Sequence, residues 1–579
     1  MSFPARVRHL LETVANLRAH VPAGAGQITA ICTLAVLAGT AGVAFHELAA
    51  WIEHHTIARL AGQPWPVFLV GSLASVLAGS ALASWLIARV APAAAGGGVL
   101  PVKLAFWRDF GVIPMRLTVV KFFASAITLG SGVSLGPEGP AVQIGASTVS
   151  AAAGLGGVAK QNRRAYCAAG AAAGLAAVFN APLAAITFVL EEIVGDLHSR
   201  WLGSVVLAAV AGALVAHALL GAQPAFQAAP FADIGWTAWA LTPLVAAAAG
   251  FAGAAFQRGA LWFRARGNGR RSRWRPLWGA LATWVCGASV YLLCQHTGIF
   301  GIGYRDITAA IGGSLPALTA ALLLVGKLVA TCIAVGSGGC GGIFAPSLFL
   351  GAMSGALCAG LAGFLTPLNP SEQAMLVMTG MSASLGAVIR TPLTCVLLLF
   401  EVTNQFVIVP ALMLAALVSQ GVARLVNKHD MYEEMLVQDG VDPHQVLPPR
   451  HYKRWREIPV GALASFKPVV ARDTDPATLE ALLASSRHER FPVLRDSAGG
   501  VAGVLQRRDA EHAVATQTEP RLEPAVWIDA RATIGAAQKR MLGAGVDFLC
   551  VGDESRQVLE GVLTLHDLLR GQSVLEEDA

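Results

Sequence analysis

The chain has 579 residues, of which 55% are hydrophobic and only 13% are charged. Soluble domains carry roughly 25% charged residues, so this composition excludes an ordinary soluble protein and indicates an integral membrane protein. The charge is also uneven, because residues 441–579 hold 20 of the 36 acidic side chains. We therefore expect a membrane part followed by a tail with the composition of a soluble domain.

The N-terminal segment 1–26 is basic, and the apolar run after it lacks a clear cleavage site. We expect a retained cytoplasmic segment rather than a signal peptide. Two basic loops, 264–275 and 450–456, fit the positive-inside rule if both are cytoplasmic. No nucleic-acid-binding motif accompanies them. The nine cysteines are scattered without a CxxC pair, so we expect neither a disulfide framework nor a metal site.

In chain order, the membrane part alternates long apolar stretches with shorter ones bounded by Gly or Pro. A membrane-spanning helix needs about 20 apolar residues. Shorter, broken segments are tolerated at membrane depth only where they line a cavity or are buried in protein. The pattern therefore predicts a transporter or channel. The stretches are 27–50, 66–90, 117–129, 141–153, 165–179, 182–193, 202–220, 237–256, 277–295, 317–335, 344–365, 374–386, 392–401 and 407–426.

A glycine-rich block occurs twice. Residues 130–146 read GSGVSLGPEGPAVQIGA, and residues 336–352 read GSGGCGGIFAPSLFLGA. At an offset of 206 residues, seven positions agree, among them Gly136 with Gly342. This agreement indicates a duplicated membrane domain.

A second pair of blocks supports the duplication. Residues 170–191 match residues 380–401 at an offset of 210, and both blocks end on a glutamate, Glu191 or Glu401. Duplicated domains with broken helices are typical of transporters whose site lies near the membrane midplane between the repeats. Identity alone leaves open whether the halves are parallel or inverted.

The glycine-rich blocks have the features of an anion site. Each precedes an apolar, helix-like run, and neither contains Lys or Arg. Glycine permits the backbone conformations that turn several N–H groups toward one point, and a helix start adds partial positive charge. Such a site binds an anion yet releases it. Close helix packing accounts for many glycines, but it does not account for PEGP at 137–140 or IFAP at 343–346.

Three glutamates at membrane depth have different expected roles. Glu138 lies at the expected helix start in the first block, where its carboxylate can satisfy the helix dipole or compete with an anion and gate the pathway. We predict gating. Glu191 has the counterpart Glu401, which favours a shared structural role. Glu192 corresponds to Val402, so it breaks the repeat and suggests a proton-relay task found in one half only.

One motif would suggest a hydrolase rather than a transporter. Gly132-Val-Ser134-Leu-Gly136 satisfies the G-x-S-x-G pattern of hydrolase nucleophile elbows. That elbow requires a preceding strand and a partnered histidine and acid. An apolar membrane segment precedes Ser134, and the repeat has Cys340 at the serine position. We therefore expect no enzyme.

These blocks resemble the CLC family of chloride channels and proton-coupled chloride antiporters, and the similarity covers nearly the whole chain. Gly136-Pro-Glu138-Gly-Pro140 resembles the GREGP motif of that family, and residues 341–346 resemble its GGIFAP motif. The segment from Phe179 to Glu192 resembles the one that ends in the antiporters' internal proton glutamate.

The resemblance implies an all-α polytopic membrane domain with two inverted repeats of broken helices, assembled as a homodimer with one anion pathway per subunit. It implies that Glu138 is the external gating glutamate and Glu192 the internal proton glutamate. It assigns the anion-binding positions to Gly97, Gly136, Gly139, Ile343, Phe344 and Tyr432.

Two positions depart from the family pattern. The family's GSGIP element appears as Gly-Gly-Gly-Val-Leu-Pro at 96–101, so Gly97 replaces the serine whose hydroxyl touches the anion. This leaves the preference among chloride, nitrate and fluoride open. Pro137 replaces the arginine of GREGP. Both glutamates are retained, and an acid at the Glu192 position favours an antiporter over a channel.

The tail resembles a pair of CBS domains. Two βαβ-like units each contain a G-h-h-x-x-x-D pattern that ends a strand and opens a helix, one at 503–509 and one at 561–567. In the CBS family the Thr and Asp of this pattern often hold a nucleotide ribose. Thr564 and Asp567 fit that role, whereas Gln506 does not. An adenine nucleotide at the CBS pair and a purely dimer-stabilising tail both remain open.

We therefore expect a cytoplasmic segment 1–26, a transmembrane anion-transport domain 27–436, a linker 437–458 and a soluble α/β tandem CBS domain 459–579. The expected function is secondary active exchange of chloride, or a similar monovalent anion, for protons. A passive voltage- or pH-gated chloride channel is the alternative. We expect no required cofactor, and a multi-pass location in a bacterial inner membrane with both termini cytoplasmic.

Overall fold

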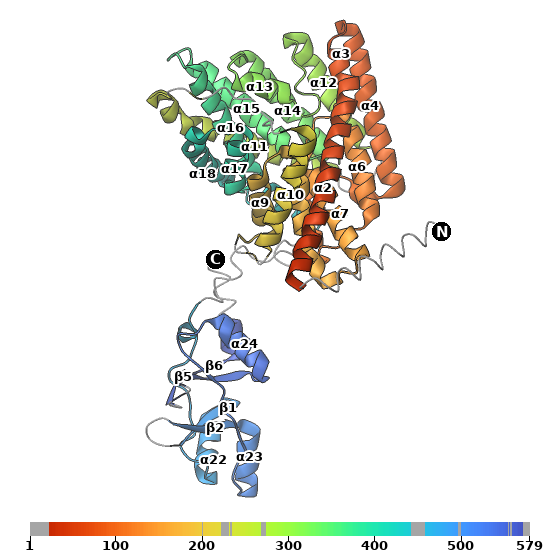
Figure 1. Ribbon diagram of the computed structural model, residues 1–579. Helices are drawn as coiled ribbons and strands as arrows, with labels where there is room; N and C mark the ends of the chain where they lie inside the picture. Colours follow the sequence, from red (N-terminus) through yellow and green to blue (C-terminus); the bar gives the residue numbers. More distant parts are fainter. Residues whose placement is uncertain are drawn as a thin grey trace, which may run out of the picture. The chain divides into compact units, whose positions relative to one another are not determined.

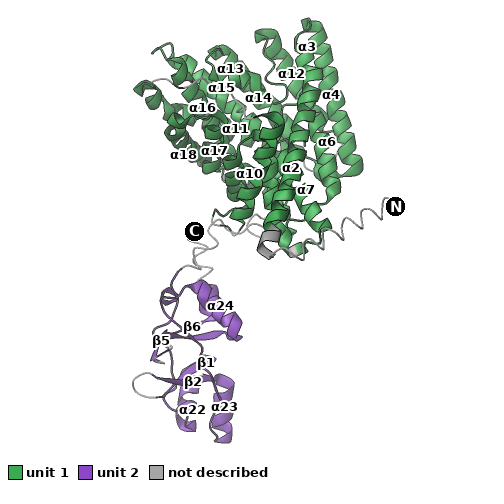
Figure 2. Ribbon diagram, viewed as in Figure 1, with its two compact units in different colours: residues 1–447 green, residues 448–579 purple. Residues whose placement is uncertain are grey.

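The computed structural model contains two compact units, Met1–Leu447 and Pro448–Ala579 (Figure 2). Residues 1–22 of the expected N-terminal segment and 442–457 of the expected linker lie outside the described residues. The structure describes residues 23–197, 199, 201–221, 231, 234–267, 274–441, 458–495, 500–553, 555 and 558–570.

The first unit is helical over its described residues apart from one isolated β-bridge (Figure 1). Eight of the described helices are long and apolar enough to cross a membrane, judged by length and composition. The first half contains α2 (Ala23–Glu53), α3 (Arg59–Ala61), α4 (Trp65–Val90), α5 (Val99–Arg108), α6 (Met115–Gly130), α7 (Glu138–Leu155), α8 (Arg163–Phe179), α9 (Pro182–Phe188) and α10 (Leu202–Leu220). The second half contains α11 (Trp236–Gly267), α12 (Pro276–Cys294), α13 (Tyr304–Ile311), α14 (Ala317–Gly336), α15 (Phe344–Ala362), α16 (Pro370–Ile389), α17 (Pro392–Thr403) and α18 (Val409–Val426), followed by α19 (Met431–Gln438).

The two halves of this unit are inverted. The isolated bridge joins Gly136 to Gly342, which are equivalent positions of the two glycine-rich blocks, and it is antiparallel. The Gly136 N–H donates to the Gly342 carbonyl at 2.9 Å, and the Gly342 N–H donates back at 2.5 Å. An antiparallel pair of equivalent residues is symmetric about a two-fold axis, so the two glycine-rich blocks run in opposite directions where they meet.

Two glutamates repeat this symmetry as reciprocal helix caps. The Glu191 carboxylate accepts hydrogen bonds from the Leu393 and Thr394 N–H groups, at 3.2 and 2.9 Å, at the start of α17. The Glu401 carboxylate accepts from Leu183 and Ala184, at 2.8 and 2.7 Å, at the start of α9. Each carboxylate satisfies N–H groups that have no acceptor within the helix and lies at its positive end. This is the shared structural role that the repeat predicted for Glu191.

Glycine allows the repeat helices to pack backbone against backbone. A Cβ on Gly145 of α7 would lie 2.2 Å from the Gly170 carbonyl oxygen of α8. The equivalent Gly351 of α15 has the same separation from the Gly380 oxygen of α16. Larger residues would force these pairs apart, so both contacts fix the positions of the helices that begin at the glycine-rich blocks.

The second unit consists of two small α/β halves. The strands β1 (Arg490–Leu494), β2 (Val501–Gln506) and β3 (Leu522–Glu523) form one antiparallel sheet, joined by α22 (Pro476–Ser485) and α23 (Arg507–Thr516). The other sheet contains β4 (Trp527–Ile528), β5 (Phe548–Asp553) and β6 (Val558–Thr564), with α24 (Ile534–Ala544) before β5. Burial in this second sheet raises the pKa of the Cys550 thiol to about 12, so it stays protonated at neutral pH.

The capping role of Glu401 gives a stability prediction. Replacing Glu401 with Ala removes two charge-assisted hydrogen bonds from the start of α9, at a cost of about 1–3 kcal/mol. We expect a lower midpoint of thermal unfolding for the detergent-solubilised protein. The control is Glu47→Ala, at an exposed position of α2. Equal midpoints for Glu401→Ala and Glu47→Ala would contradict the capping role.

Candidate functional site

Three stretches of backbone meet between the starts of α7 and α15. A Cβ on Gly139 would lie 2.2 Å from the Gly97 carbonyl oxygen and 3.3 Å from the Gly342 Cα. A Cβ on Gly98, whose φ is +107°, would lie 2.4 Å from the Gly139 oxygen. Only glycine fits such approaches, so the structure brings the predicted positions Gly97, Gly136 and Gly139 together around the bridge at Gly342.

The Glu138 carboxylate lies in the same place. The residue is 1% exposed, and its Oε2 is 3.4 Å from the position of a Cβ on Gly342. The carboxylate is beside Ala345 at the start of α15. Neither carboxylate oxygen has a hydrogen-bond partner among the described residues. A negative group thus sits at the positive end of the opposite repeat's helix, where an anion would be attracted.

The two helix starts differ in their supply of N–H donors. Pro137 precedes α7, whereas the equivalent residue before α15 is Ile343. Proline has no N–H, so the second repeat offers one donor more than the first. Ile343 and Phe344 are buried, and the Phe344 ring packs edge-on against Phe188 at 4.9 Å between centroids. The start of α15 is therefore the better anion-binding end.

Tyr432 lies in the same hydrophobic core cluster as Ile343 and Phe344. It is the second residue of α19 and is 4% exposed. Asp430 caps this helix by accepting hydrogen bonds from the Tyr432 and Glu433 N–H groups at 2.9 and 2.8 Å. The cap fixes the start of α19 and with it the placement of the tyrosine.

Sequence reasoning missed two buried lysines that hold the loops before α5 and α13. The Lys121 ammonium donates to the Ala94 and Gly96 carbonyls at 3.1 and 2.5 Å, just before Gly97. Lys327 donates to the Gly298 and Gly301 carbonyls at 2.9 and 2.7 Å, among others. The two lysines are separated by 206 residues, the same offset as the glycine-rich blocks. Extending the comparison of the two halves beyond those blocks would therefore have identified them as an equivalent pair.

Glu192 lies apart from Glu191, although the two are neighbours in sequence. The chain from Val189 to Val194 forms a π-helical turn that extends α9, a feature frequent at functional sites. Glu191 reaches α17, while Glu192 is buried and its Oε1 lies 2.6 Å from the Lys103 ammonium. The equivalent Val402 lies within an α-helix, so the π turn and the ion pair both distinguish the first half.

Helix α5 connects the two predicted functional glutamates. It begins at Val99, directly after the glycines that contact Gly139, and Lys103 lies about 6 Å further along its axis. The helix packs against both α7 and the π turn. Sequence reasoning did not single out Lys103; its position in an apolar helix at membrane depth was the available signal.

A further buried polar group lies beside this region. Gln143 of α7 is fully buried, and neither polar atom of its carboxamide has a partner among the described residues. Its Oε1 would lie 3.2 Å from a Cβ on Gly98. Buried amides nearly always have a partner, so water or a transported ion is the expected one.

Ser134 does not have the surroundings of a nucleophile. Helix α6 ends shortly before it, where a nucleophile elbow requires a strand. Its hydroxyl shares a 2.8 Å hydrogen bond with the hydroxyl of Thr331 on α14.

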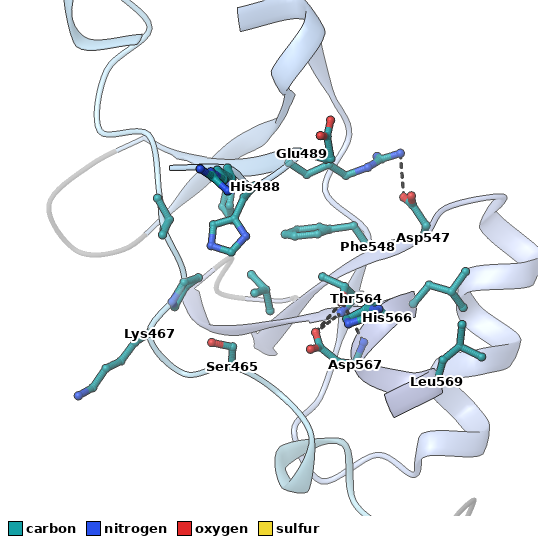
Figure 3. Close-up of a pocket in the computed structure, with 17 residues that line it drawn as sticks. Ser465, Lys467, His488, Glu489, Asp547, Phe548, Thr564, His566, Asp567 and Leu569 are labelled. Atoms are coloured by element: carbon teal, nitrogen blue, oxygen red, sulfur yellow. Dashed lines mark hydrogen bonds and ion pairs between the residues drawn. The ribbon is translucent and has the colours of Figure 1, made fainter. Parts of the chain in front are cut away.

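The tail contains a cavity of about 660 Å³ lined by both of its α/β halves (Figure 3). Asp567 accepts hydrogen bonds from the Thr564 N–H and hydroxyl at 3.0 and 2.6 Å, and both residues face the cavity. In the first half, the Gln506 amide instead donates to Glu523 at 2.5 Å. The basic residues that line the cavity are Lys467, Arg487, His488, Arg490 and His566.

An inverted pair of broken-helix repeats with a buried site at their junction defines the membrane unit as a transporter-type ion pathway. A family model described as voltage gated chloride channel matches residues 79–424, and the chain belongs to this family. A CBS domain model matches residues 522–573.

Curated relatives and solved structures agree with this family. The H(+)/Cl(-) exchange transporter ClcA of Cronobacter sakazakii is 31% identical over 421 residues, covering 70% of this chain and 87% of the relative. The protein of the same name from Vibrio campbellii is 33% identical over 380 residues, covering 63% and 79%.

Two solved structures share the fold. A slow cyanobacterial Cl-/H+ antiporter has a TM-score of 0.63 at 24% identity and covers 71% of this chain and 97% of its own. A eukaryotic CLC transporter has a TM-score of 0.59 at 19% identity and covers 93% and 98%.

The Lys103–Glu192 pair yields a prediction. Lys103→Met leaves the buried Glu192 carboxylate without its cation, and breaking a buried pair from one side costs about 3–5 kcal/mol. We expect a clear fall in the thermal unfolding midpoint. The double variant Lys103→Met/Glu192→Gln carries no unpaired charge and should recover part of the loss. A double variant whose loss equals the sum of the two single losses would show that the groups act independently.

Proposed function

We propose that this chain is a secondary active transporter that exchanges chloride, or a similar monovalent anion, for protons. The observation that carries the proposal is the pair of buried acids on one connected path. Glu138 lies at the junction of the repeats, and Glu192 is joined to that junction by α5 through Lys103. The exchange activity named for the ClcA relatives supports the same reading.

Proton and anion movement are coupled because the Glu138 carboxylate and the anion compete for the start of α15. While Glu138 is ionised, its carboxylate occupies the positive end of that helix and excludes an anion of like charge. Protonation removes the charge and the attraction, so the side chain leaves and an anion takes its place. The displaced carboxyl group releases its proton to the side that it faces, and the carboxylate that results returns to the start of α15 and displaces the anion.

Glu192 supplies protons to Glu138 from the other side of the membrane. Lys103 holds the buried Glu192 side chain by an ion pair at 2.6 Å. The second half has Val402 at the equivalent position, so the proposed proton path belongs to the first half.

Proton pumping tests this function. In liposomes containing the full chain, a chloride gradient with a potassium ionophore should drive protons uphill. Glu192→Gln should reduce proton movement to the level of protein-free liposomes while anion flux continues, and Glu138→Ala should also uncouple the flux. The control Glu47→Gln, at an exposed acid, should pump normally. Chloride flux without proton movement in the wild type would make the protein a passive channel.

The proposal assigns anion coordination to Gly97, Gly136, Gly139, Ile343, Phe344 and Tyr432, and anion preference to Gly97. A Cβ at Gly97 would lie 3.6 Å from the Gly341 oxygen, an ordinary contact, so a serine fits there. The added hydroxyl can donate one hydrogen bond to an anion at the junction.

We expect Gly97→Ser to fold and to change the chloride-to-nitrate flux ratio by roughly two- to tenfold, the range of one hydrogen bond. Gly98→Ser is the matched control, because its φ of +107° and a contact of 2.4 Å with Gly139 exclude a side chain. It should fail to give a stable protein. An unchanged ratio in a stable Gly97→Ser protein would remove this position from the anion site.

A homodimer in a bacterial inner membrane, with both termini cytoplasmic, is part of the same proposal. The repeat-equivalent Leu183 and Leu393, at the starts of α9 and α17, are each 45% exposed beside the capping carboxylates. A second copy would shield these charged caps from lipid. The basic segments of the sequence support the orientation.

An adenine nucleotide is the ligand proposed for the tail. In this proposal Thr564 and Asp567 hold the ribose, Phe548 stacks on the base, and Lys467 and Arg487 attract the phosphates; all five residues line the cavity. Nucleotide binding there would regulate exchange and is not required for it.

Calorimetric titration of the full chain with ATP tests this ligand. The wild type should bind, and Arg487→Gln should weaken binding by roughly fivefold or more, since one charge-assisted hydrogen bond is lost. Arg508→Gln, at an exposed arginine outside the cavity, should bind like the wild type. No binding and no change in exchange at millimolar ATP would remove the nucleotide from the account.

A further inference from the structure

A groove of about 610 Å³ lies on the membrane unit where α12 and α14 face the end of α11. Its wall consists mainly of apolar side chains that are partly exposed. Trp278, Val285 and Val329 are 66%, 49% and 42% exposed, respectively. The groove is part of neither the anion site nor the tail.

Two arginines lie at the end of this apolar wall. The Arg266 guanidinium stacks over the Trp262 ring at 3.3 Å from its centroid. Arg275 donates to the Gly267 and Gly336 carbonyls at 2.8 and 3.0 Å, which fixes its position. None of the described residues that line the groove is acidic.

The neighbouring Arg264 differs from Arg266 and Arg275 because it has an acidic partner. It is paired with the Asp439 carboxylate at 2.8 Å and does not line the groove. Asp439 therefore neutralises Arg264, whereas Arg266 and Arg275 face a groove with no acidic side chain among the described residues that line it, so positive charge remains there.

Aromatic residues place this end of the groove at a membrane surface. Trp262, Trp274 and Trp278 are 51%, 45% and 66% exposed, and exposed tryptophans gather at the boundary between lipid and water. A molecule that fills the groove must therefore have an apolar chain that packs against the apolar wall and a negative group that binds Arg266 and Arg275. A soluble anion would leave the wall uncovered, and a neutral lipid would leave the charge unmatched.

We propose that this groove binds one anionic phospholipid, with its phosphate at Arg266 and Arg275 and an acyl chain along α12 and α14. Basic pockets between membrane helices are suited to anionic headgroups. The site also adjoins the ion pathway. The Gly336 carbonyl that binds Arg275 belongs to the first residue of the second glycine-rich block, which leads to Ile343 and Phe344.

Native mass spectrometry of the delipidated full chain in detergent tests the proposal, with dioleoyl-phosphatidylglycerol as the probe and dioleoyl-phosphatidylcholine as the neutral comparison. We expect preferential retention of phosphatidylglycerol. Arg266→Gln should weaken it by roughly fivefold, the value of one basic residue near a charged lipid. Arg258→Gln, at an exposed arginine of α11 outside the groove, should have no effect.

A second pair of variants tests the acyl-chain path without touching charge. Val329→Trp fills the groove, whereas Val325→Trp places the same side chain on the same helix at a 59% exposed position outside it. Only the first should lose phosphatidylglycerol. Equal retention of both lipids by the wild type would overturn the proposal, as would equal effects of the two tryptophans. Displacement of the lipid by glycerol 3-phosphate alone would also overturn it, since that would indicate a site for the headgroup only. None of these outcomes depends on transport.

Discussion

The antiparallel pairing of Gly136 with Gly342 is the contact on which the membrane unit depends. It brings two helix starts from opposite halves of the chain to one buried point, so two positive helix ends converge there. The surrounding backbone contacts follow from it, because Gly98 and Gly139 can approach their neighbours only without side chains of their own. The lysines at 121 and 327 then hold the adjoining loops by their carbonyl groups. A binding point made from main chain and helix ends attracts an anion without trapping it.

The two halves differ at the positions to which the proposed function is assigned. Glu138 has Phe344 as its counterpart, Pro137 has Ile343, and Glu192 has Val402. Glu138 gives one side of the junction a negative group, and Ile343 gives the other side one N–H donor more than Pro137 does. Glu192 gives the first half a buried acid, and the π turn orients that acid toward Lys103. Where the repeats agree, as for Glu191 and Glu401, the side chains cap helices.

The repeat, the membrane class and the shared structural role of Glu191 and Glu401 were accessible from the sequence, because equivalent residues recur at a fixed offset. The family resemblance predicted that Gly97, Gly136, Gly139 and Glu138 share a site, and the structure brings them together. The inversion was not accessible from identity, because residue matches carry no direction; the antiparallel bridge supplies it. Lys103 was missed because its partner is 89 residues away and only the packing of α5 against the π turn joins them. Gln143 and the groove beside Arg275 also depend on tertiary packing.

The most direct test of the account is the position of a bound anion at the repeat junction. A crystal of the Glu138→Gln variant grown with bromide reports this through anomalous scattering, since the neutral side chain no longer competes for the start of α15. The account predicts a bromide peak within hydrogen-bonding distance of the Ile343 and Phe344 N–H groups. Bromide bound elsewhere in the membrane unit, with that position empty, would contradict the claim that the paired helix starts form the anion site.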